Sequence, residues 1–424
     1  MKTIAVIAEF NPFHNGHLHL IEQCKKDLEA DRCVIIMSGD FVQRGAPALI
    51  DKFTRTKTAL LSGADVCIEL PIYYALGSAE YFAAGAVSIL DKLGCIDYLC
   101  FGSECGEIKY LEKTAEILNK EPELFKSTLS ACLKSGQSFA SSREKAVLTF
   151  ITNEDPSISD EKLKEFKNIL SEPNNTLALE YIKALKKRNS KIVPYTIKRK
   201  GEHYKSETLN EFSSATAIRE AILNSPKNNI VFSIKNTMPP VCADLLQSYD
   251  SEFAFTTKEK SEKLDVLLQY KLILCNNRTF SEYLDVSEDI SNKISSYLDY
   301  YNGFDDFCTH LKSKNLAYSR LSRICMHILL DIKTQNMQEY KNDDYTSYAR
   351  ILGMKSSASD VLKLAKKTSS IPIINRLKDA DNKSCNLSYL QKRLLSETLN
   401  SSKIYNLLYK KDQVNEYRIK QIIF

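Results

Sequence analysis

The chain of 424 residues contains no tryptophan and only six histidines. It also lacks any apolar run of the roughly 18 residues that a membrane-spanning helix needs. The N-terminal apolar stretch is short, has no small-residue cleavage site and is interrupted by Glu9 and Asn11, so we interpret it as a strand and not as a signal peptide. These absences predict a cytoplasmic protein without a membrane segment.

Metal-binding cysteine patterns are missing as well. None of the twelve cysteines forms a C-x-x-C pair, and the spacing of five between Cys95, Cys100 and Cys105 fits neither a zinc ribbon nor a zinc finger. Cys33 and Cys67 lie, like Cys100, within apolar, strand-like runs. We therefore expect free, buried thiols and no protein-bound metal centre.

The net charge of +5 is distributed unevenly along the chain. Residues 301–424 carry 21 Lys and Arg against 12 Asp and Glu, whereas the first 300 residues carry 37 against 41. A basic C-terminal third predicts contact with a polyanion. Ordinary solvated helix faces would give the same composition, so this alternative stays open.

Apolar strands alternate with helical patterns in the first half of the chain. The expected strands are 3–8, 33–37, 65–70, 98–101 and 191–198, and the expected helices between them include 17–28, 53–62, 79–92 and 177–188. This alternation predicts a doubly wound, Rossmann-like parallel α/β sheet. Residues 106–170 are charged and without strand signal, which indicates a helical insertion.

The sequence changes character beyond about residue 240, where amphipathic helices such as 262–274, 315–332 and 385–400 predominate. We therefore predict two domains. Residues 1–235 form the α/β domain, and residues 236–424 form a mostly α-helical, basic domain.

The turn after the first strand contains several residues that can bind an anion. It contains His14, Gly16 and His17, and half of the histidines of the chain fall within residues 14–19. A buried strand that ends in a glycine-bearing turn at a helix N-terminus forms an anion site, because unpaired N–H groups and the helix dipole point at the ligand. His14 and His17 lie on one side of the first helical turn and can stabilise phosphate oxygens.

A second motif follows the fifth expected strand, with Ser214, Thr216 and Arg219 at the start of a helix. Together, H-x-G-H and this S-x-T-x-I-R resemble the two signatures of the nucleotidyltransferase superfamily, the second usually written I-S-S-T-x-I-R. Ala215 stands where that motif commonly has a second hydroxyl, and Ser213 is the candidate substitute.

The resemblance extends to one family. The segments EFNPFHNGH, SGDFVQRGAPALIDK, GADVCIELP, SAEYFAAGAV, FGSE and EPNNTLALEY resemble the bacterial tRNA(Met) cytidine acetate ligases. This resemblance implies that ATP activates acetate as acetyl-adenylate with release of pyrophosphate. It further implies acetylation of the N4 amine of the wobble cytidine in elongator tRNA(Met).

The resemblance also implies site residues. His14 and His17 are predicted to be catalytic. The nucleotide pocket is predicted to comprise Ile7, Ala8, Glu9, Phe10, Asn11, Pro12, Phe13, His14, Asn15, Gly16, His17, Leu18, His19, Leu20, Gly102, Asn174, Asn175, Arg199, Ser214, Thr216 and Arg219. Gly16 would let phosphate approach the backbone. Asn174 and Asn175 could instead be helix caps, and Arg199 and Arg219 ordinary surface charges.

The loop after the second strand is expected to face the same crevice with Asp40, Gln43, Arg44, Asp51 and Lys52. Asp40 is a third catalytic candidate, which would hold the Mg²⁺ that accompanies ATP or meet the cytidine amine. A simple turn role for Asp40 is the alternative.

The basic C-terminal part is the predicted tRNA cradle. Its candidate clusters are Lys363, Lys366 and Lys367, then Lys392 and Arg393, then Lys410 and Lys411. Tyr389, Tyr405 and Tyr409 could stack on bases, although such spacing is also typical of helix packing. The sequence leaves open whether the protein is a monomer or a dimer.

Two other functions remain possible on sequence grounds. An enzyme that adenylylates a phosphate ester of a small metabolite would use the same two motifs without any RNA. A non-catalytic nucleotide sensor or RNA-binding module is the second alternative, but binding alone does not require both His14 and His17.

Overall fold

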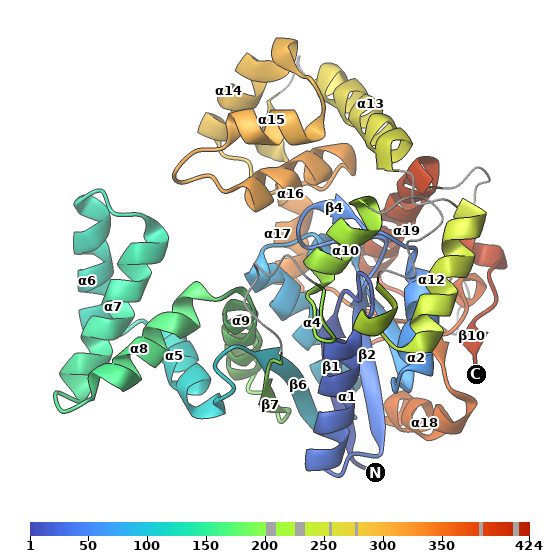
Figure 1. Cartoon of the computed structure of the whole chain (residues 1–424), viewed down its shortest axis with the longest axis horizontal. Coiled ribbons are helices and arrows are strands. Elements are labelled where there is room, and N and C mark those ends of the chain that lie inside the picture. The colour runs from blue at the N-terminus through green and yellow to red at the C-terminus, as the bar shows by residue number, and fades with distance from the viewer. Residues whose placement is uncertain (201–208, 225–233, 254–256, 276–278, 381–384, 410–414) are drawn as a thin grey trace.

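The structure is a computed structural model that describes residues 1–200, 209–224, 234–253, 257–275, 279–380, 385–409 and 415–424. Its centre is a mixed sheet with the strand order β10-β8-β5-β2-β1-β6-β7, and β9 pairs with β8 (Figure 1). The strands are β1 (Thr3–Ala8), β2 (Arg32–Ser38), β5 (Val66–Leu70), β6 (Tyr98–Ser103), β7 (Val193–Lys198), β8 (Ala349–Met354), β9 (Ile373–Ile374) and β10 (Ile422–Ile423).

The predicted parallel sheet is confirmed. Strands β5, β2, β1, β6 and β7 all run parallel to one another. The bounds differ slightly from those expected, since β6 continues to Ser103 and the first helix, α1 (Asn15–Asp27), begins two residues earlier. The carboxyl ends of these strands therefore meet at one edge, where ligands of such sheets bind.

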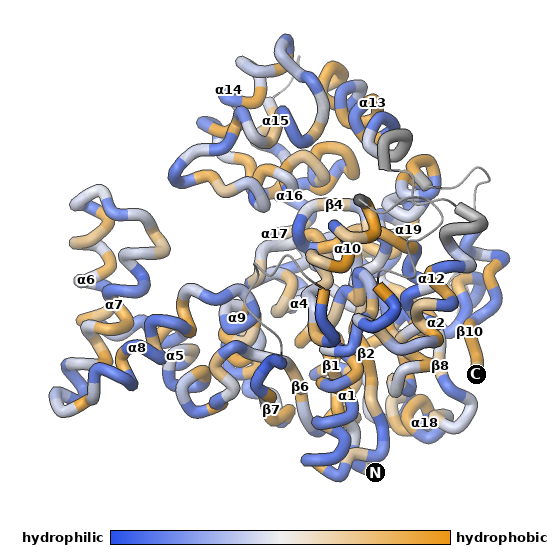
Figure 2. Tube along the Cα trace, viewed as in Figure 1, coloured by the Kyte–Doolittle hydropathy of each residue, from blue (hydrophilic) through white to orange (hydrophobic). Residues whose placement is uncertain are grey.

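Helices cover both faces of the sheet because each strand alternates its apolar side chains between two cores. In β1, Ile4 and Val6 join the cluster that includes α1, α2 (Lys52–Leu61), α10 (Ala215–Asn224) and α12 (Pro240–Phe253). Ala5 and Ile7 join the opposite cluster, with α4 (Ala79–Leu93) and α9 (Pro173–Lys187). Figure 2 shows the hydrophobic colour concentrated along the central strands.

All twelve cysteines are free, and ten of them are buried. Cys33, Cys67 and Cys100 pack in the same apolar cluster as α1. Among the described residues, no three His, Cys, Asp or Glu side chains gather as a metal site would require. None of the helices within the described ranges is long and apolar enough to cross a membrane.

The predicted helical insertion lies between β6 and α9. It consists of α5 (Ile108–Lys120), α6 (Glu123–Lys134), α7 (Phe139–Glu154) and α8 (Asp160–Ser171). Helices α5 and α8 pack on α9, whereas α6 and α7 pair with each other and project away from the sheet (Figure 1).

The C-terminal part is mostly helical, as expected. Its helices are α13 (Thr257–Cys275), α14 (Glu288–Tyr297), α15 (Phe304–Leu311), α16 (Tyr318–Leu329), α17 (Thr334–Asn342), α18 (Ser359–Thr368) and α19 (Tyr389–Tyr409). It also contributes three strands that the sequence did not predict: β8 pairs antiparallel with β5, and β9 and β10 pair parallel with β8. The division at residue 235 stays a prediction, because both parts share one sheet.

A buried ionic network joins the two parts next to the ends of β2 and β5. The Lys52 ammonium lies 2.6 Å from Glu69, 2.9 Å from Glu416 and 3.7 Å from Asp40. Arg350 bonds both Glu69 and Glu416. Although burial opposes ionisation of Glu416, Lys52 and Arg350 lower its pKa to about 2. This network fixes the C-terminal residues against the sheet.

Candidate active site

A pocket of about 400 Å³ opens at the carboxyl ends of β1 and β6. The chain leaves these two neighbouring strands toward opposite sides of the sheet, which is the position where doubly wound folds bind ligands. The residues that line it are Val6, Ile7, Ala8, Glu9, Phe10, Asn11, His14, His17, Leu20, Gln43, Arg44, Ala79, Phe82, Phe101, Gly102, Pro173, Asn174, Thr176, Leu177, Tyr181, Arg199, Ser214, Ala215, Thr216 and Arg219.

His14 and His17 form the N-terminal cap of α1. The Gly16 amide donates to Nδ1 of His14 at 3.1 Å, and the His14 amide donates to Nδ1 of His17 at 3.2 Å. The two rings stack with their centroids 3.7 Å apart. The histidines thus occupy the places that Ser and Glu take in an ordinary capping box.

This arrangement sets the tautomer of both rings. Because each Nδ1 accepts a backbone N–H, the proton of each neutral imidazole resides on Nε2, which is left as a donor for a ligand. Burial, followed by Arg199 and Arg219, lowers the pKa of His14 to about 3. Burial, His14 and Arg199 lower the pKa of His17 well below its ordinary value. The pair therefore offers two neutral N–H donors at physiological pH.

The position of the His14 ring requires a glycine at residue 16. A Cβ at this position would lie 2.9 Å from Cε1 and 3.0 Å from Nδ1 of the His14 ring. The missing side chain therefore makes room for the imidazole, and Gly16 does not itself line the pocket. Phe10, at φ +48°, takes a conformation that is rare for a bulky residue, and its ring packs against Phe13 and His17. The aromatic rings hold the turn beneath the histidines.

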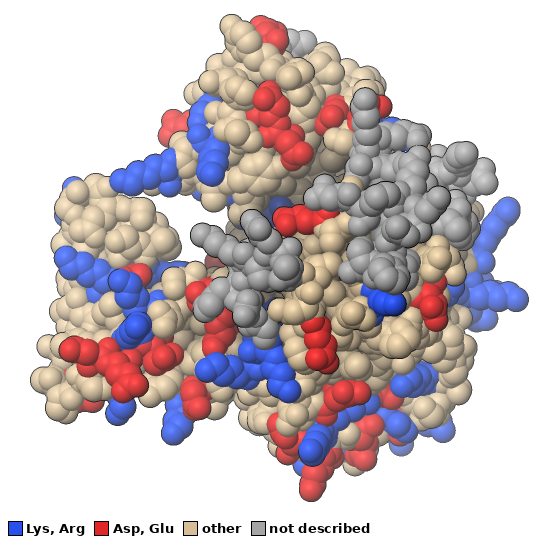
Figure 3. Space-filling model, in the orientation of Figure 1, with Lys and Arg blue, Asp and Glu red and all other residues tan. Residues whose placement is uncertain are grey.

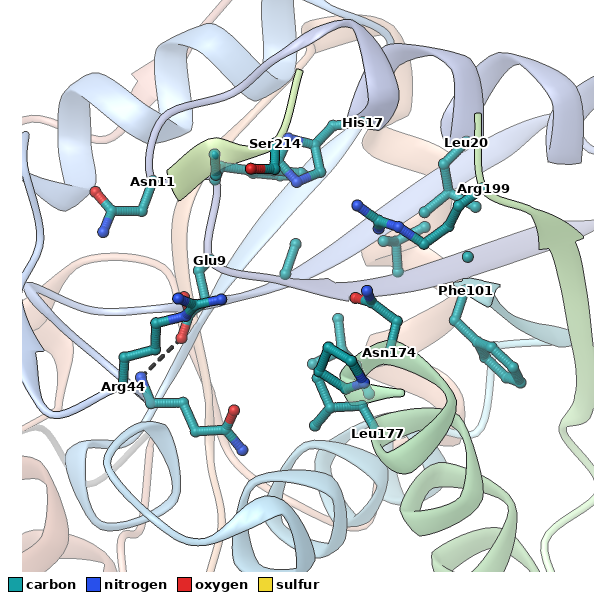
Figure 4. Close-up of a pocket in the computed structure, with 18 of the residues that line it drawn as sticks. Glu9, Asn11, His17, Leu20, Arg44, Phe101, Asn174, Leu177, Arg199 and Ser214 are labelled. Atoms are coloured by element: carbon teal, nitrogen blue, oxygen red, sulfur yellow. Dashed lines mark hydrogen bonds between the residues drawn. The ribbon is translucent and has the colours of Figure 1, made fainter. Parts of the chain in front are cut away.

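The second motif supports the first. Arg219 donates to the Asn11 backbone carbonyl at 2.7 Å and to the Thr216 hydroxyl at 3.1 Å. Ser214 caps α10 by accepting from the Ala217 amide at 3.2 Å. Ser214, Thr216 and Arg219 all line the pocket, and Figure 4 shows Ser214 beside His17. Arg219 thus connects the two motifs by hydrogen bonds to Asn11 and Thr216.

Ser213 does not take the place of the hydroxyl that Ala215 lacks. Its side chain is buried and exchanges hydrogen bonds with the backbone of Asn210, at 2.8 and 2.9 Å. It lies outside the pocket lining, whereas Ala215 lies within it.

The floor of the pocket is fixed from α9. The Glu104 carboxylate accepts from the Asn174 side chain at 2.6 Å and from the Asn175 amide at 2.9 Å. Asn174 lines the pocket. Asn175 is fully buried outside it and accepts from the Cys105 amide at 3.2 Å. Of the two asparagines, Asn174 is placed to meet a ligand.

Gly102 and Arg199 lie together at the ends of β6 and β7. A Cβ on Gly102 would come within 3.1 Å of Cγ of Arg199, so the glycine lets the arginine side chain cross the strand end. Arg199 is exposed and lines the pocket, opposite Arg44 in Figure 4.

Several predicted site residues lie outside the pocket lining. Asn15 bonds the Glu211 and Asn236 carbonyls, and His19 packs against the Phe212 ring. The others in the 7–20 segment are Pro12, Phe13, Gly16 and Leu18. The segment therefore supplies both ligand-facing residues and the support behind them.

Asp40 is also outside the pocket. Its carboxylate accepts from the Lys52 amide at 2.9 Å and faces the Lys52 ammonium, and burial raises its pKa. Asp51 caps α2 by accepting from the Phe53 and Thr54 amides. This geometry agrees with the alternative of a turn role for Asp40, whose carboxylate lies outside the pocket lining. Gln43 and Arg44, in contrast, line it as expected.

Part of the lining was not anticipated from the sequence. Pro173, Thr176 and Leu177 share one face of α9 with Tyr181, while Ala79 and Phe82 come from the first turn of α4. The spacing of 173, 176 and 177 is the signal that could have identified the α9 face. That these α9 residues face the pocket follows only from the packing of α4 on α9.

The predicted tRNA-binding residues are scattered. Lys363, Lys366 and Lys367 are exposed on α18, which is anchored by the 2.9 Å pair between Arg32 and Asp360 at the amino end of β2. This is the sheet edge opposite the pocket. Around α18 and α1, Figure 3 shows basic side chains mixed with acidic ones.

The residues on α19 differ in exposure. Lys392 is exposed, whereas Arg393 is half-buried and paired with Glu339 at 2.7 Å. Tyr389 is exposed, and Tyr405 is buried with its hydroxyl on the Ala48 carbonyl. Lys410 and Lys411, and the side chain of Tyr409, lie outside the described part of the structure.

Known proteins match almost the whole length of this chain. A family model described as HIGH Nucleotidyl Transferase matches residues 1–421. The tRNA(Met) cytidine acetate ligase of Clostridium tetani is 40% identical over 97% of this chain and 96% of its own. That of Clostridium perfringens is 38% identical over the full length of both chains.

Solved structures give the same result. The crystal structure of apo Thermotoga maritima TmcAL has a TM-score of 0.90 with 28% identity, covering 100% of this chain and 99% of the other. The Thermotoga maritima TmcAL structure bound with alpha-thio ATP has a TM-score of 0.87 with 27% identity and the same coverage. The fold of the whole chain is thus found in an enzyme that binds an ATP analogue.

Proposed function

The chain belongs to the tRNA(Met) cytidine acetate ligase family, and on that premise we propose that it activates acetate with ATP and transfers the acetyl group to tRNA. In the first step an acetate oxygen attacks the α-phosphorus of ATP, and pyrophosphate leaves with the electron pair of the broken P–O bond. In the second step the N4 amine of the wobble cytidine of elongator tRNA(Met) attacks the acetyl carbonyl. N4-acetylcytidine forms, AMP leaves, and the amine loses a proton.

The stacked pair of His14 and His17 supports this function best. In-line displacement at phosphorus depends mainly on positioning and on stabilisation of the charge that grows on the leaving oxygens. Two Nε2–H donors, fixed by their backbone bonds and shielded from water, are organised before the phosphate arrives. Neither imidazole needs to exchange a proton, which agrees with the lowered pKa of both.

The remaining pocket residues suit a nucleotide. Arg199 lies at the rim where phosphates or ribose would pass, and Asn174 is held by Glu104 as a hydrogen-bonding group on the floor. Apolar surface for the base comes from Leu20, Phe101 and Leu177. The pocket volume of about 400 Å³ falls in the range of roughly 300–1,000 Å³ that is typical of small-molecule sites.

The residues of the pocket fit a protein-held Mg²⁺ poorly. Glu9 is the carboxylate in its lining, and one Glu9 oxygen already accepts from the Gln43 amide at 2.7 Å. Magnesium requires near-octahedral oxygen ligation and is often carried largely by phosphates and water. A magnesium ion would therefore arrive with ATP, and no step depends on a protein ligand for it.

For the tRNA, the rim of the pocket is a stronger candidate than α18. Lys198, Arg199 and Lys200 are consecutive and exposed where β7 ends, beside the pocket. A phosphate backbone there would bring a splayed wobble base to the acetyl-adenylate. Since ATP and tRNA are molecules of the cytoplasm, this reaction also supports the predicted cytoplasmic location.

Exchange of labelled pyrophosphate into ATP tests the first step. We expect exchange that requires acetate and is abolished in His17→Ala, with acetylation of cytidine when elongator tRNA(Met) is added. Turnover with a phosphate ester and none with acetate would instead establish a small-metabolite adenylyltransferase. Nucleotide binding without any exchange would favour the sensor.

A further inference from the structure

The pocket lining contains a carboxylate among its cations. Glu9, which follows β1, is the acidic side chain of the lining, and Arg44, Arg199 and Arg219 are the basic ones. Figure 4 shows Glu9 and Arg44 on one side of the cavity and Phe101 and Arg199 on the other. A carboxylate repels both the phosphates of ATP and the carboxylate of acetate. The Glu9 side therefore suits a part of a ligand that donates hydrogen bonds.

Glu9 is held in a fixed orientation. The fully buried Arg55 donates to the Glu9 backbone carbonyl at 2.7 Å. The amide of Gln43, on the turn between β3 (Phe41–Val42) and β4 (Ala46–Pro47), donates to Oε1 of Glu9 at 2.7 Å. Arg44, the next residue, offsets the charge of the carboxylate from the same side of the pocket. Since an ionised carboxylate has about four lone-pair sites, Glu9 can accept a further N–H group from a ligand.

A phenol hydroxyl accompanies this carboxylate. Tyr181 lines the pocket from α9, is 4% exposed, and packs its ring on Phe101 with the centroids 5.7 Å apart. Its hydroxyl has no hydrogen-bond partner among the residues that the structure describes. Burial, followed by the charge of Glu9, raises the pKa of Tyr181, so the hydroxyl keeps its proton and stays a donor. The apolar lining that accompanies this acceptor and this donor comes from Ile7, Ala79 and Phe82.

An acceptor together with a donor matches the edge of a nucleobase that carries an exocyclic amine next to an unprotonated ring nitrogen. Cytosine has N4–H₂ as a donor and N3 as an acceptor on this edge, and carboxylates accept from N4 in known base contacts. Uracil has the reverse pattern, with O4 as an acceptor and N3–H as a donor. Proteins commonly read a splayed RNA base on this edge while aromatic side chains stack on it.

We propose that Glu9 and Tyr181 bind the wobble cytosine, with the Glu9 carboxylate accepting from the N4 amine and the Tyr181 hydroxyl donating to N3. Figure 4 shows His17 along the edge between the Glu9 side and the side of Leu20 and Phe101, where adenine finds apolar surface. The amine is thereby brought toward an acyl group carried on the α-phosphate. This inference rests on the proposed function and adds to it the residues that select the base.

The preference for cytidine tests the assignment. Two transcripts of elongator tRNA(Met) are compared, one with cytidine at the wobble position as the substrate and one with uridine there as a competitive inhibitor. Glu9→Gln is expected to lower the ratio of the inhibition constant of the uridine transcript to KM of the cytidine transcript at least tenfold. The reason is that an amide can turn its N–H₂ toward O4, whereas a carboxylate cannot. Tyr181→Phe keeps the ring on Phe101 and is expected to raise KM of the cytidine transcript at least threefold.

Matched controls come from the opposite edge of the sheet. Glu29 is exposed and precedes β2, and Tyr98 begins β6, so both lie at the amino ends of the strands. Glu29→Gln and Tyr98→Phe should change neither the ratio nor KM of the cytidine transcript. Circular dichroism establishes that each variant is folded, and Tyr181→Phe tests the subsite by itself if Glu9→Gln does not fold.

Adenine has the same edge as cytosine, with N6–H₂ next to N1, so a second measurement separates the two bases. Pyrophosphate exchange without tRNA gives the preference for ATP over inosine triphosphate. If Glu9→Gln relaxes this preference and leaves the cytidine preference intact, the pair binds adenine and the inference is overturned. A folded Glu9→Gln and a folded Tyr181→Phe with wild-type constants for both transcripts would overturn it as well. If the wild type shows no acetate-dependent exchange, the proposed function itself is wrong.

Discussion

The two nitrogens of each active-site imidazole have separate tasks, and this division can be tested by a pair of amide substitutions. In His17 the Nδ1 atom accepts from the His14 amide, and Nε2 is left for the ligand. The Asn side chain places an acceptor at the Nδ1 position and nothing at Nε2. The Gln side chain reaches the Nε2 position with an N–H donor and leaves the His14 amide without its acceptor.

The expected effects follow from typical magnitudes. Loss of one fixed donor to a developing oxyanion costs about 10²–10³ in kcat. Loss of a helix-capping acceptor costs about 1 kcal/mol of stability. Both variants also lose the ring contacts with Phe10 and Phe13, so the informative comparison is between them. We expect His17→Asn to be the more stable by about 1 kcal/mol and the less active by about 10-fold or more, given these donor and cap values.

Pyrophosphate exchange and urea unfolding followed by far-ultraviolet circular dichroism measure the two effects. The absence of tryptophan removes the usual fluorescence probe. His19→Asn is the matched control, because His19 belongs to the same helix but lies outside the pocket lining. If His17→Asn were the more active of the pair, Nε2 would not be the donor to phosphate and the tautomer assignment would be wrong.

Four further outcomes are expected. Gly16→Ala should displace the His14 ring and lower kcat of exchange at least tenfold, whereas an unchanged kcat would show that the ring tolerates a Cβ 2.9 Å away. Glu104→Ala should raise KM for ATP several-fold by releasing Asn174, and an ATP titration with an unchanged KM would refute this role. Lys52→Met should lower the free energy of unfolding by about 3–5 kcal/mol in urea titrations, because it removes the buried ammonium that faces three carboxylates and leaves Arg350 alone to compensate Glu69 and Glu416; a loss below 1 kcal/mol would contradict this. Because the folded state holds His14 neutral down to about pH 3 while the unfolded chain takes up a proton near pH 6.5, stability should fall as pH drops through that window, and His14→Asn should flatten the slope.

Much of the α/β part can be predicted from local patterns in the sequence. β1 and β2 are continuous apolar runs, which is how strands buried on both faces appear, and each ends in a polar, glycine-bearing turn. The rule that ligands bind at the carboxyl ends of parallel strands then predicts that His14, Gly102 and Arg199 share one edge, and all three do line or border the pocket there. These predictions depend on periodicity and topology, which need no knowledge of distant partners.

The position of Asp40 could not be predicted in this way. Asp40 looked like a ligand because it follows β2 directly, yet the structure turns it toward Lys52. The other partners of Lys52 are Glu69 and, far along the chain, Glu416. A buried charge is explained by the residue that neutralises it, and sequence position does not reveal a partner that lies hundreds of residues away.

The same long-range contacts decide how the two parts of the chain relate. β8 extends the sheet beside β5, and α16 presses on Gly45 next to Arg44, so C-terminal residues both complete the sheet and shape the pocket rim. An independent C-terminal tRNA cradle would not need either contact. Since Arg44 lines the pocket, the contact between α16 and Gly45 lies one residue from the site. The geometry therefore favours a C-terminal part that belongs to the catalytic unit.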